Sequence, residues 1–456
     1  MWSWFAPRCP VSTYEKAWLE TRMCWLAERV PIDRLLQCEV LTRIDPSFLP
    51  LDNWQAVDRV IKFLATRIGV DPSLVEFEYC RDFQLSGIAS PAPIAVQEDR
   101  IRVLTGSESL EAERLISRLV HGVSYAFLYN NKHLSLDDEE GLLLAELLAV
   151  FLGFGLFVAN ATVRDADWRL GIVRGWEMSR QGYVTSHMCG YALALFAHMR
   201  GEYSPSWGKL LRKDARESFV KGLAFLRSGG ETAFDPRTIR TGIRTPTATE
   251  SREHLERGAP STRLIALWKL AEQPPLASDF EPLVVRALRD RESEIVAAAA
   301  KLVGIHGASM PEAQEELLPC LNSKHSKVQL EAVSALGALG LNPEIVVPEL
   351  RVMLRSLSRD GDRVVIKAAA IAAGRFGREA AICAPFLLAH LSVALVKVDE
   401  ELVQTLVEAL VSVCDDPVTE IRERFPSGDE GLRRMAESRV EERLNAAVND
   451  GDIVWE

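Results

Sequence analysis

One histidine lies in the middle of a long apolar segment, where its ring could take part in metal-assisted hydrolysis. Residues 119–125 read LVHGVSY, and the helical spacing of apolar residues around them predicts a helix over 107–129. A zinc hydrolase site on a helix needs two histidines one turn apart, and a glutamate after the first to take a proton from bound water. His121 fits the first position, whereas Gly122 and Tyr125 stand where the glutamate and the second histidine belong.

The elements around this segment are predicted from hydrophobic periodicity and capping residues. The short polar connection at 130–138 makes the helices on either side of it antiparallel neighbours. The alternation at 74–80 predicts a strand, and Glu98-Asp99 between two apolar runs predicts a hairpin over 93–104. The predicted helices are 13–29 with Thr13 as N-cap, 52–68 with Asp52 as N-cap, 107–129, 138–160, 187–200 and 206–227.

A repeating pattern begins near residue 263. Residues 293–304 are echoed at 326–337 and again at 362–374, each an Ala-rich run that ends in glycine. These glycines stand 33 and then 37 residues apart, with partner helices predicted at 312–321, 343–356 and 380–396. Helix pairs at such a period indicate an α-solenoid, because each pair has an apolar face that only a neighbouring pair can bury. The copies resemble HEAT repeats over roughly 263–415.

The apolar helix pair at 115–160 resembles the helix-loop-helix of gluzincin metallopeptidases in its length and in its position after a strand region. In that family the third zinc ligand is a glutamate on the next helix. The corresponding window holds Leu142, Leu143, Leu144 and Ala145, none of which binds zinc. Glu146 matches the second-shell acid that the family carries one turn later. The resemblance implies that the fold was kept and the catalytic machinery lost.

The N-terminal half as a whole is similar to a group of uncharacterised bacterial proteins in which a zincin-like domain precedes HEAT repeats. The segments that carry this similarity are 9–26, 151–157 and 180–183. The resemblance implies a mostly α chain with a small α+β zincin-like N-terminal domain and a C-terminal HEAT-like α-solenoid. The expected divisions are 1–230 for the zincin-like domain with a degenerate metal motif, 231–262 for a polar linker, 263–449 for the solenoid with a capping helix at 420–449, and 450–456 for an acidic tail.

Other polar groups are weaker candidates for chemistry. His133 with Asp137, Asp138, Glu139 and Glu140 could bind a cation, although an acidic helix start commonly complements the helix dipole.

The remaining histidines, His187 and His198, lie about three helical turns apart and have only Cys189 nearby. They are interpreted as structural. Ser124 lacks the strand-to-helix turn of a hydrolase nucleophile. Gly153 and Gly155 lie inside an apolar helix, so they favour close packing over dinucleotide binding. Arg237, Arg240 and Arg244 are interpreted as a solvated linker.

Composition limits the classes of function. The chain has 456 residues, 48% hydrophobic and 26% charged, with a net charge of −11. Nucleic-acid binding relies on cationic side chains that displace counterions, so no nucleic-acid partner is expected.

The eight scattered cysteines indicate reduced thiols, and the Pro- and Arg-containing N-terminus lacks the apolar core of a secretory signal. The apolar stretch 142–158 is shorter than a membrane span. A cytoplasmic location without membrane contact is predicted.

The favoured function is a non-catalytic scaffold that binds a protein partner through the solenoid, with no metal and no cofactor. The alternative is a hydrolase with a rearranged site that uses His121, Tyr125 and Glu146, with Glu139 or Glu140 as a further acid. A third hypothesis is similarity to bilin-lyase-type HEAT proteins that act on a chromophore, for which the sequence supplies no attachment chemistry.

Overall fold

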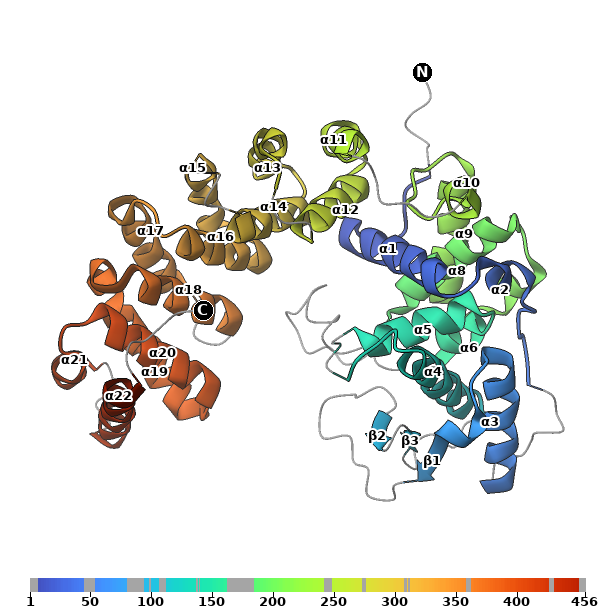
Figure 1. Cartoon of the computed structure of the whole chain (residues 1–456), viewed down its shortest axis with the longest axis horizontal. Helices are drawn as coiled ribbons and strands as arrows, with labels where there is room; N and C mark the ends of the chain where they lie inside the picture. Colours follow the sequence, from blue (N-terminus) through green and yellow to red (C-terminus); the bar gives the residue numbers. More distant parts are fainter. Residues whose placement is uncertain are drawn as a thin grey trace. The chain divides into compact units, whose positions relative to one another are not determined.

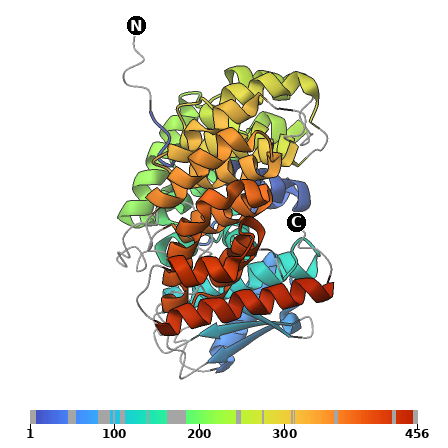
Figure 2. The same cartoon turned by 90° about the vertical axis from the view of Figure 1, so that its left-hand side faces the viewer.

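The computed structural model of the chain is mostly helical and forms two compact units, Met1–Thr245 and Pro246–Glu456 (Figures 1 and 2). It describes residues 7–44, 54–79, 94–97, 100–105, 112–136, 138, 140–161, 184–241, 248–272, 276–306, 310, 312–357, 362–425 and 430–450.

Unit 1 begins with helices close to their predicted positions. Its helices are α1 (Thr13–Arg29), α2 (Ile32–Gln37), α3 (Trp54–Ile68), α4 (Ala112–Asn130), α5 (Gly141–Phe151), α6 (Gly155–Ala161), α8 (Ser186–Arg200), α9 (Lys213–Arg227) and α10 (Pro236–Thr241), with short 3-10 turns η3 (Pro72–Leu74) and η6 (Ser206–Leu210). The prediction of Thr13 as N-cap is wrong by one residue. Ser12 caps α1 because Glu15, three residues on, completes a reciprocal capping box with it. Asp52 lies outside the described residues.

Two predicted helices are divided. The helix expected at 138–160 breaks between α5 and α6, where Gly153 has φ +87° and packs so closely that an added Cβ would lie 2.7 Å from the Glu39 carbonyl oxygen. A side chain there would be both strained and obstructed. The helix expected at 206–227 becomes η6 and α9, with Leu211 in an extended conformation between them.

The strands form a small mixed sheet in the order β1-β3-β2. β2 (Ile94–Gln97) and β3 (Arg100–Thr105) are antiparallel, which confirms the hairpin, whereas β1 (Val75–Tyr79) is parallel to β3. Buried Ile101 and Val103 lie on the face that α4 covers. On the other face Glu76 pairs with Arg100 and Arg102, as expected for an open face in water.

Unit 2 is built from helix pairs. Its helices are α11 (Ala248–Arg257), α12 (Pro260–Ala271), α13 (Glu281–Ala287), α14 (Ser293–His306), α15 (Ala313–Leu317), α16 (Ser326–Leu339), α17 (Pro343–Ser356), α18 (Arg363–Phe376), α19 (Ala384–Lys397), α20 (Glu400–Val413), α21 (Pro417–Arg424) and α22 (Glu430–Asp450), with 3-10 turns η7 (Ser278–Phe280), η9 (Pro319–Asn322) and η10 (Gly377–Cys383). The three Ala-rich copies are α14, α16 and α18, as predicted.

Two expectations, one for the stretch that joins the two units and one for the end of unit 2, are corrected. The stretch 231–262 is not simply a polar linker, because α10, α11 and the start of α12 lie within it and Phe234 is fully buried. The capping helix expected at 420–449 consists of α21 and α22, which pack against each other.

Unit 2 has solenoid-like packing. α12, α14, α16, α18 and α20 pack each against the next and form what we call the stacked row. The other helix of each pair, from α11 to α19, belongs to the partner row, and Figure 1 shows α11, α13, α15 and α17 lying along the outer side of the stacked row. Small residues allow the close approach: an added Cβ on Gly337 would lie 2.8 Å from Ala372 of the next copy.

Within the described residues, one continuous stretch, Arg363–Lys397, has the length and apolar composition of a membrane span. The structure divides it at Gly377 into α18 and the segment formed by η10 and α19. More than half of its most apolar window is buried inside the protein, and α18 packs between α16 and α20. Much of its apolar character therefore serves helix packing.

Candidate functional site

His121 lies in the contact between α4 and α5. The ring is buried, and its Nε2 atom lies 3.0 Å from the backbone carbonyl oxygen of Leu142. Burial lowers the pKa of the imidazole to about 4, so the ring is neutral at physiological pH. A neutral ring in contact with a carbonyl oxygen donates through Nε2–H. This nitrogen is therefore engaged in joining the two helices.

Gly122, the residue after His121, lies where α4 packs closely on the sheet. An added Cβ would lie only 2.2 Å from Val103 Cγ2, because α4 crosses β3 at this point. The position faces the sheet and has no room for any side chain. A longer side chain at this position would point into packed strand atoms.

Tyr125 and Glu146 also have structural roles. The Tyr125 ring packs against Gly141 and stacks on Tyr129 with ring centroids 6.4 Å apart. One carboxylate oxygen of Glu146 accepts a hydrogen bond of 3.0 Å from the backbone N–H of Val184. Burial raises the pKa of this carboxyl to about 8, against the opposing effect of that hydrogen bond. Each sequence candidate therefore contacts a different local group.

The described members of the acidic group suggested for a cation have separate partners. Glu140 accepts hydrogen bonds from Trp18 Nε1 at 3.1 Å and from Arg22 Nε at 2.8 Å, whereas Asp138 accepts from the N–H of Ser135. The His133 ring lies near the rings of Trp25 and Phe127. Asp137 and Glu139 lie outside the described residues. Across the part of the chain that the structure describes, no three His, Cys, Asp or Glu side chains are grouped to hold a metal ion.

The other predicted candidates are also separate. His187 Nδ1 lies 2.9 Å from Ser218 Oγ, and the Cys189 thiol contacts the Val184 carbonyl oxygen. Ser124 is fully buried, and its hydroxyl has no hydrogen-bond partner among the described residues.

In the arginine cluster, the backbone N–H of Arg237 donates to Asp235. Nothing is described for Arg244 or for the side chain of Arg240.

Sequence reasoning missed a buried polar cluster that joins α1, α8 and the segment before α10. Lys16 Nζ lies 2.9 Å from Glu20 Oε1, and both residues are buried. Tyr191 donates to Oε1 at 2.8 Å, and the Ala233 N–H donates to Oε2 at 2.8 Å. Burial, followed by the charge of Glu20, raises the pKa of Tyr191 well above its usual range.

The only sequence signal for this cluster is a Lys and a Glu four residues apart. That spacing is common on exposed helix surfaces, and it gives no indication of burial.

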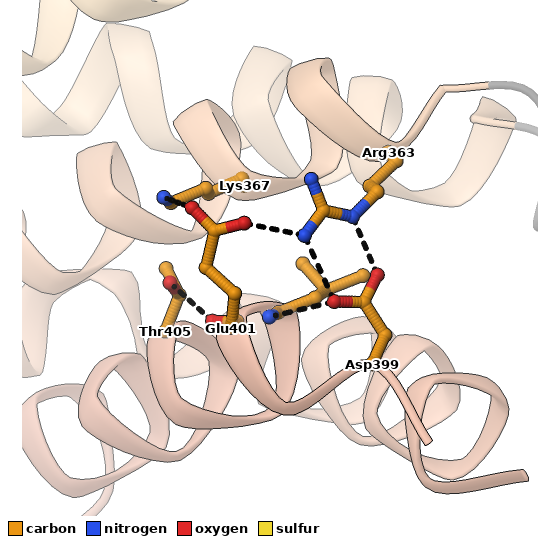
Figure 3. Close-up of polar contacts among 6 residues, drawn as sticks. Arg363, Lys367, Asp399, Glu401 and Thr405 are labelled. Carbon is orange, nitrogen blue, oxygen red and sulfur yellow. Dashed lines mark hydrogen bonds and ion pairs between the residues drawn. The ribbon is translucent and has the colours of Figure 1, made fainter. Parts of the chain in front are cut away.

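Unit 2 carries a contrasting cluster on its surface, between α18 and α20 (Figure 3). Arg363 donates to both Asp399 and Glu401, and Lys367 donates to Glu401. Asp399 also caps α20 by accepting from the N–H of Leu402. Lys367 and then Arg363 lower the pKa of Glu401 to about 2. The cluster joins α18 to α20, and its side chains remain between 21% and 58% exposed.

Comparison with known proteins gives no family. No model of a known protein family matches the sequence, and no curated protein is similar to it. Among solved structures, the chain aligns with the crystal structure of an engineered protein from the Northeast Structural Genomics Consortium. The alignment covers 94% of this chain and 99% of the other, with 14% identity and a TM-score of 0.32. A likeness at that level carries no conclusion about fold or function.

Proposed function

We propose that the protein is a non-catalytic scaffold that binds a protein partner through the stacked row of unit 2. The observation that carries the proposal is the sequential packing of α12, α14, α16, α18 and α20, which lays consecutive helices side by side. Solenoids of this kind present extended surfaces, and a HEAT-type repeat accounts for the Ala-rich copies. The cytoplasmic location stays a prediction.

The charge of unit 2 indicates the chemistry of that partner. From Pro246 to Glu456 the sequence has 24 Lys and Arg residues against 34 Asp and Glu residues, whereas Met1–Thr245 has 29 against 30. Almost all of the net negative charge of the chain therefore belongs to the unit with the repeats. A partner with a cationic surface is expected, because complementary potentials steer association.

The geometry around His121 supports the non-catalytic part of the proposal. His121 donates to a backbone carbonyl, position 122 accommodates only glycine, and Glu146 accepts a hydrogen bond from the backbone N–H of Val184. In this proposal unit 1 is a zincin-like domain whose former catalytic helix has become a packing element. No observation favours the rearranged hydrolase or the chromophore-binding alternative.

The test blocks the stacked row without disturbing its core. Ser334 and Ala338 are exposed and lie one turn apart on α16. The double substitution Ser334→Arg with Ala338→Arg is compared with Ser356→Arg, an exposed position of α17 in the partner row. Affinity capture from cell extract with the intact protein, followed by mass spectrometry, identifies a partner, and calorimetry measures its affinity.

We expect the double variant to lose the partner and Ser356→Arg to retain it. Retention by both variants, with unchanged affinity, would place binding elsewhere and refute this function. Metal analysis on the same sample addresses the enzyme alternative. Stoichiometric zinc, with hydrolysis that is lost in His121→Ala, would replace the scaffold by an enzyme.

A further inference from the structure

One surface of unit 1 has a charge opposite to that of the chain as a whole. From Tyr203 to Arg227 the sequence has six Lys and Arg residues and two acidic residues, a net charge of +4, whereas the whole chain has −11. This segment forms η6 and α9, and α9 packs along α8 (Figure 1). All six cations are exposed: Lys209, Arg212, Lys213, Arg216, Lys221 and Arg227.

The segment forms one continuous surface. α9 has a buried side that includes Phe219 and Leu223, so its other side faces solvent. η6 lies against this helix, because Arg216 Nη1 donates to the Lys209 carbonyl oxygen at 3.4 Å. The Arg227 guanidinium lies over the Tyr203 ring, 5.3 Å from its centre. We call the solvent side of Tyr203, η6 and α9 the basic face.

Several cations of the basic face are not neutralised by a neighbouring carboxylate. Lys221 pairs with Glu217 one turn away. In the part of the chain that the structure describes, Lys209, Arg212 and Lys213 form no salt bridge. Cations that lie close together without counter-charges create a positive potential that attracts a polyanion. The face therefore suits an anionic partner.

Bulky uncharged side chains are exposed within the same face. Leu210 is 55% exposed, Val220 is 58% exposed and Tyr203 is 47% exposed. A nucleic acid offers phosphates and base rings, which gain little from aliphatic side chains. The boundary of a lipid bilayer offers anionic headgroups to the cations and acyl chains to the aliphatic groups, and tyrosine is enriched there.

The arrangement on α9 fits that boundary. By helical spacing, Val220 lies along the middle of the solvent side, with Arg216 and Arg227 along one edge and Lys221 along the other. Long cationic side chains can extend to lipid phosphates while the apolar group between them enters the acyl region. Charge and apolar surface can therefore act on a membrane at the same time.

We propose that the basic face of unit 1 binds the surface of a membrane that contains anionic lipids, with Leu210 and Val220 entering the boundary between headgroups and acyl chains. The expectation of no membrane contact rested on the lack of a membrane span, which a peripheral surface does not need. Charges more than about 8 Å from the bilayer are largely screened at physiological ionic strength. The charge next to the lipid, and not the net charge of the chain, therefore decides binding.

The experiment measures co-sedimentation of the full chain with vesicles of phosphatidylglycerol and phosphatidylcholine in equal parts, and with vesicles of phosphatidylcholine alone. We expect binding to the anionic vesicles that high salt weakens, and little binding to the neutral ones. Lys209→Gln with Lys213→Gln should weaken binding about thirtyfold, because each cation near an anionic bilayer contributes about fivefold. Arg59→Gln with Lys62→Gln removes two exposed cations of α3 and should leave binding unchanged, although it changes the net charge equally.

Leu210→Ser with Val220→Ser tests the apolar part of the contact. These substitutions keep every charge, and both sites are exposed, so the fold should be retained. We expect binding to the anionic vesicles to weaken about tenfold, because less apolar surface leaves water. Circular dichroism of the wild type and of each variant checks that all are folded.

Absence of binding to the anionic vesicles at low ionic strength would overturn the proposal, and so would equal binding by the lysine variant and the wild type. An unchanged affinity in the Leu210 and Val220 variant would also overturn it, since contact through charge alone indicates an acidic protein or a nucleic acid at this face. These substitutions lie in unit 1 and those of the scaffold test lie in unit 2, so either proposal can fail without the other.

Discussion

The buried cluster of unit 1 and the surface cluster of unit 2 use the same residue types under opposite conditions. Glu20 is 1% exposed and is satisfied by a lysine, a tyrosine hydroxyl and a backbone N–H. The Glu401 carboxylate accepts hydrogen bonds from Arg363 and Lys367, yet more than half of its side chain is exposed. Water can replace a lost partner in the second cluster and is excluded from the first. The contribution of an ion pair to stability is therefore decided by burial.

The largest expected effect comes from Glu20→Ala. Removal of this carboxylate takes an acceptor from the buried side chains of Lys16 and Tyr191 and from the Ala233 N–H. We expect a loss of about 4 kcal/mol in the free energy of unfolding of unit 1, measured by urea denaturation. Glu217→Ala, which removes an exposed partner of Lys221 on α9, should give no measurable change. Equal losses in the two variants would remove the contrast between buried and exposed pairs.

Gly122→Ala tests whether position 122 is fixed by packing between α4 and β3. The new methyl group would overlap Val103 Cγ2, and backbone separation should cost about 3 kcal/mol. Gly304→Ala is the control, because its nearest neighbour, Ala335 Cα, lies at 3.3 Å and α14 gains from the helix propensity of alanine. Thermal unfolding monitored by circular dichroism measures both. A Gly122→Ala protein as stable as the wild type would show that α4 can move away from β3.

Glu146→Gln tests the buried carboxyl through its pH dependence. The pKa of Glu146 is raised from 4.5 to about 8, so the folded protein retains a proton that the unfolded chain releases. Stability therefore falls as pH rises between those values. His121 acts in the opposite direction, because its pKa is lowered from 6.5 to about 4 and it reduces stability only as pH falls below 6.5.

From pH 6.5 to 8 the contribution of Glu146 should amount to at most about 2 kcal/mol. Glu146→Gln keeps an acceptor for the Val184 N–H and should remove that part of the slope. Urea titrations at the two pH values measure it. An identical pH dependence in variant and wild type would mean that the carboxyl titrates normally.

The smallest effect is expected for Arg363→Gln. Its partners Asp399 and Glu401 remain hydrated, so the free energy of unfolding should fall by less than about 1 kcal/mol. The difference should shrink further in high salt, since exposed charges are screened. Calorimetry at low and high ionic strength provides the measurement. A large loss that salt does not reduce would show that the surface cluster behaves like the buried one.

Much of the fold follows from local pattern. The copies that end in Gly304, Gly337 and Gly374 predict α14, α16 and α18, because the apolar face of each repeat requires a neighbour. Glu98-Asp99 between two apolar runs predicts the β2–β3 hairpin. The break at Gly153 could not be predicted from local sequence. Gly153 has a positive φ and packs against Glu39, which is distant in the chain.

The candidate site shows the same difference between what local sequence predicts and what distant contacts decide. The sequence singled out His121, Tyr125 and Glu146 because their types and spacing suggest hydrolysis. The structure gives each a separate structural partner, through contacts between segments that spacing alone does not bring together. The buried cluster around Glu20 was missed for the converse reason, because its partners Tyr191 and Ala233 lie far away in the chain.

The sequence by itself determined a mostly helical chain, the repeating helix pairs, and a glycine and a tyrosine one and four residues after His121. These features follow directly from the residue types and their spacing along the chain. Only the tertiary structure decided which polar groups are buried and that position 122 has no room for a side chain. Such properties depend on which distant segments meet, because burial and close contact belong to the packed chain.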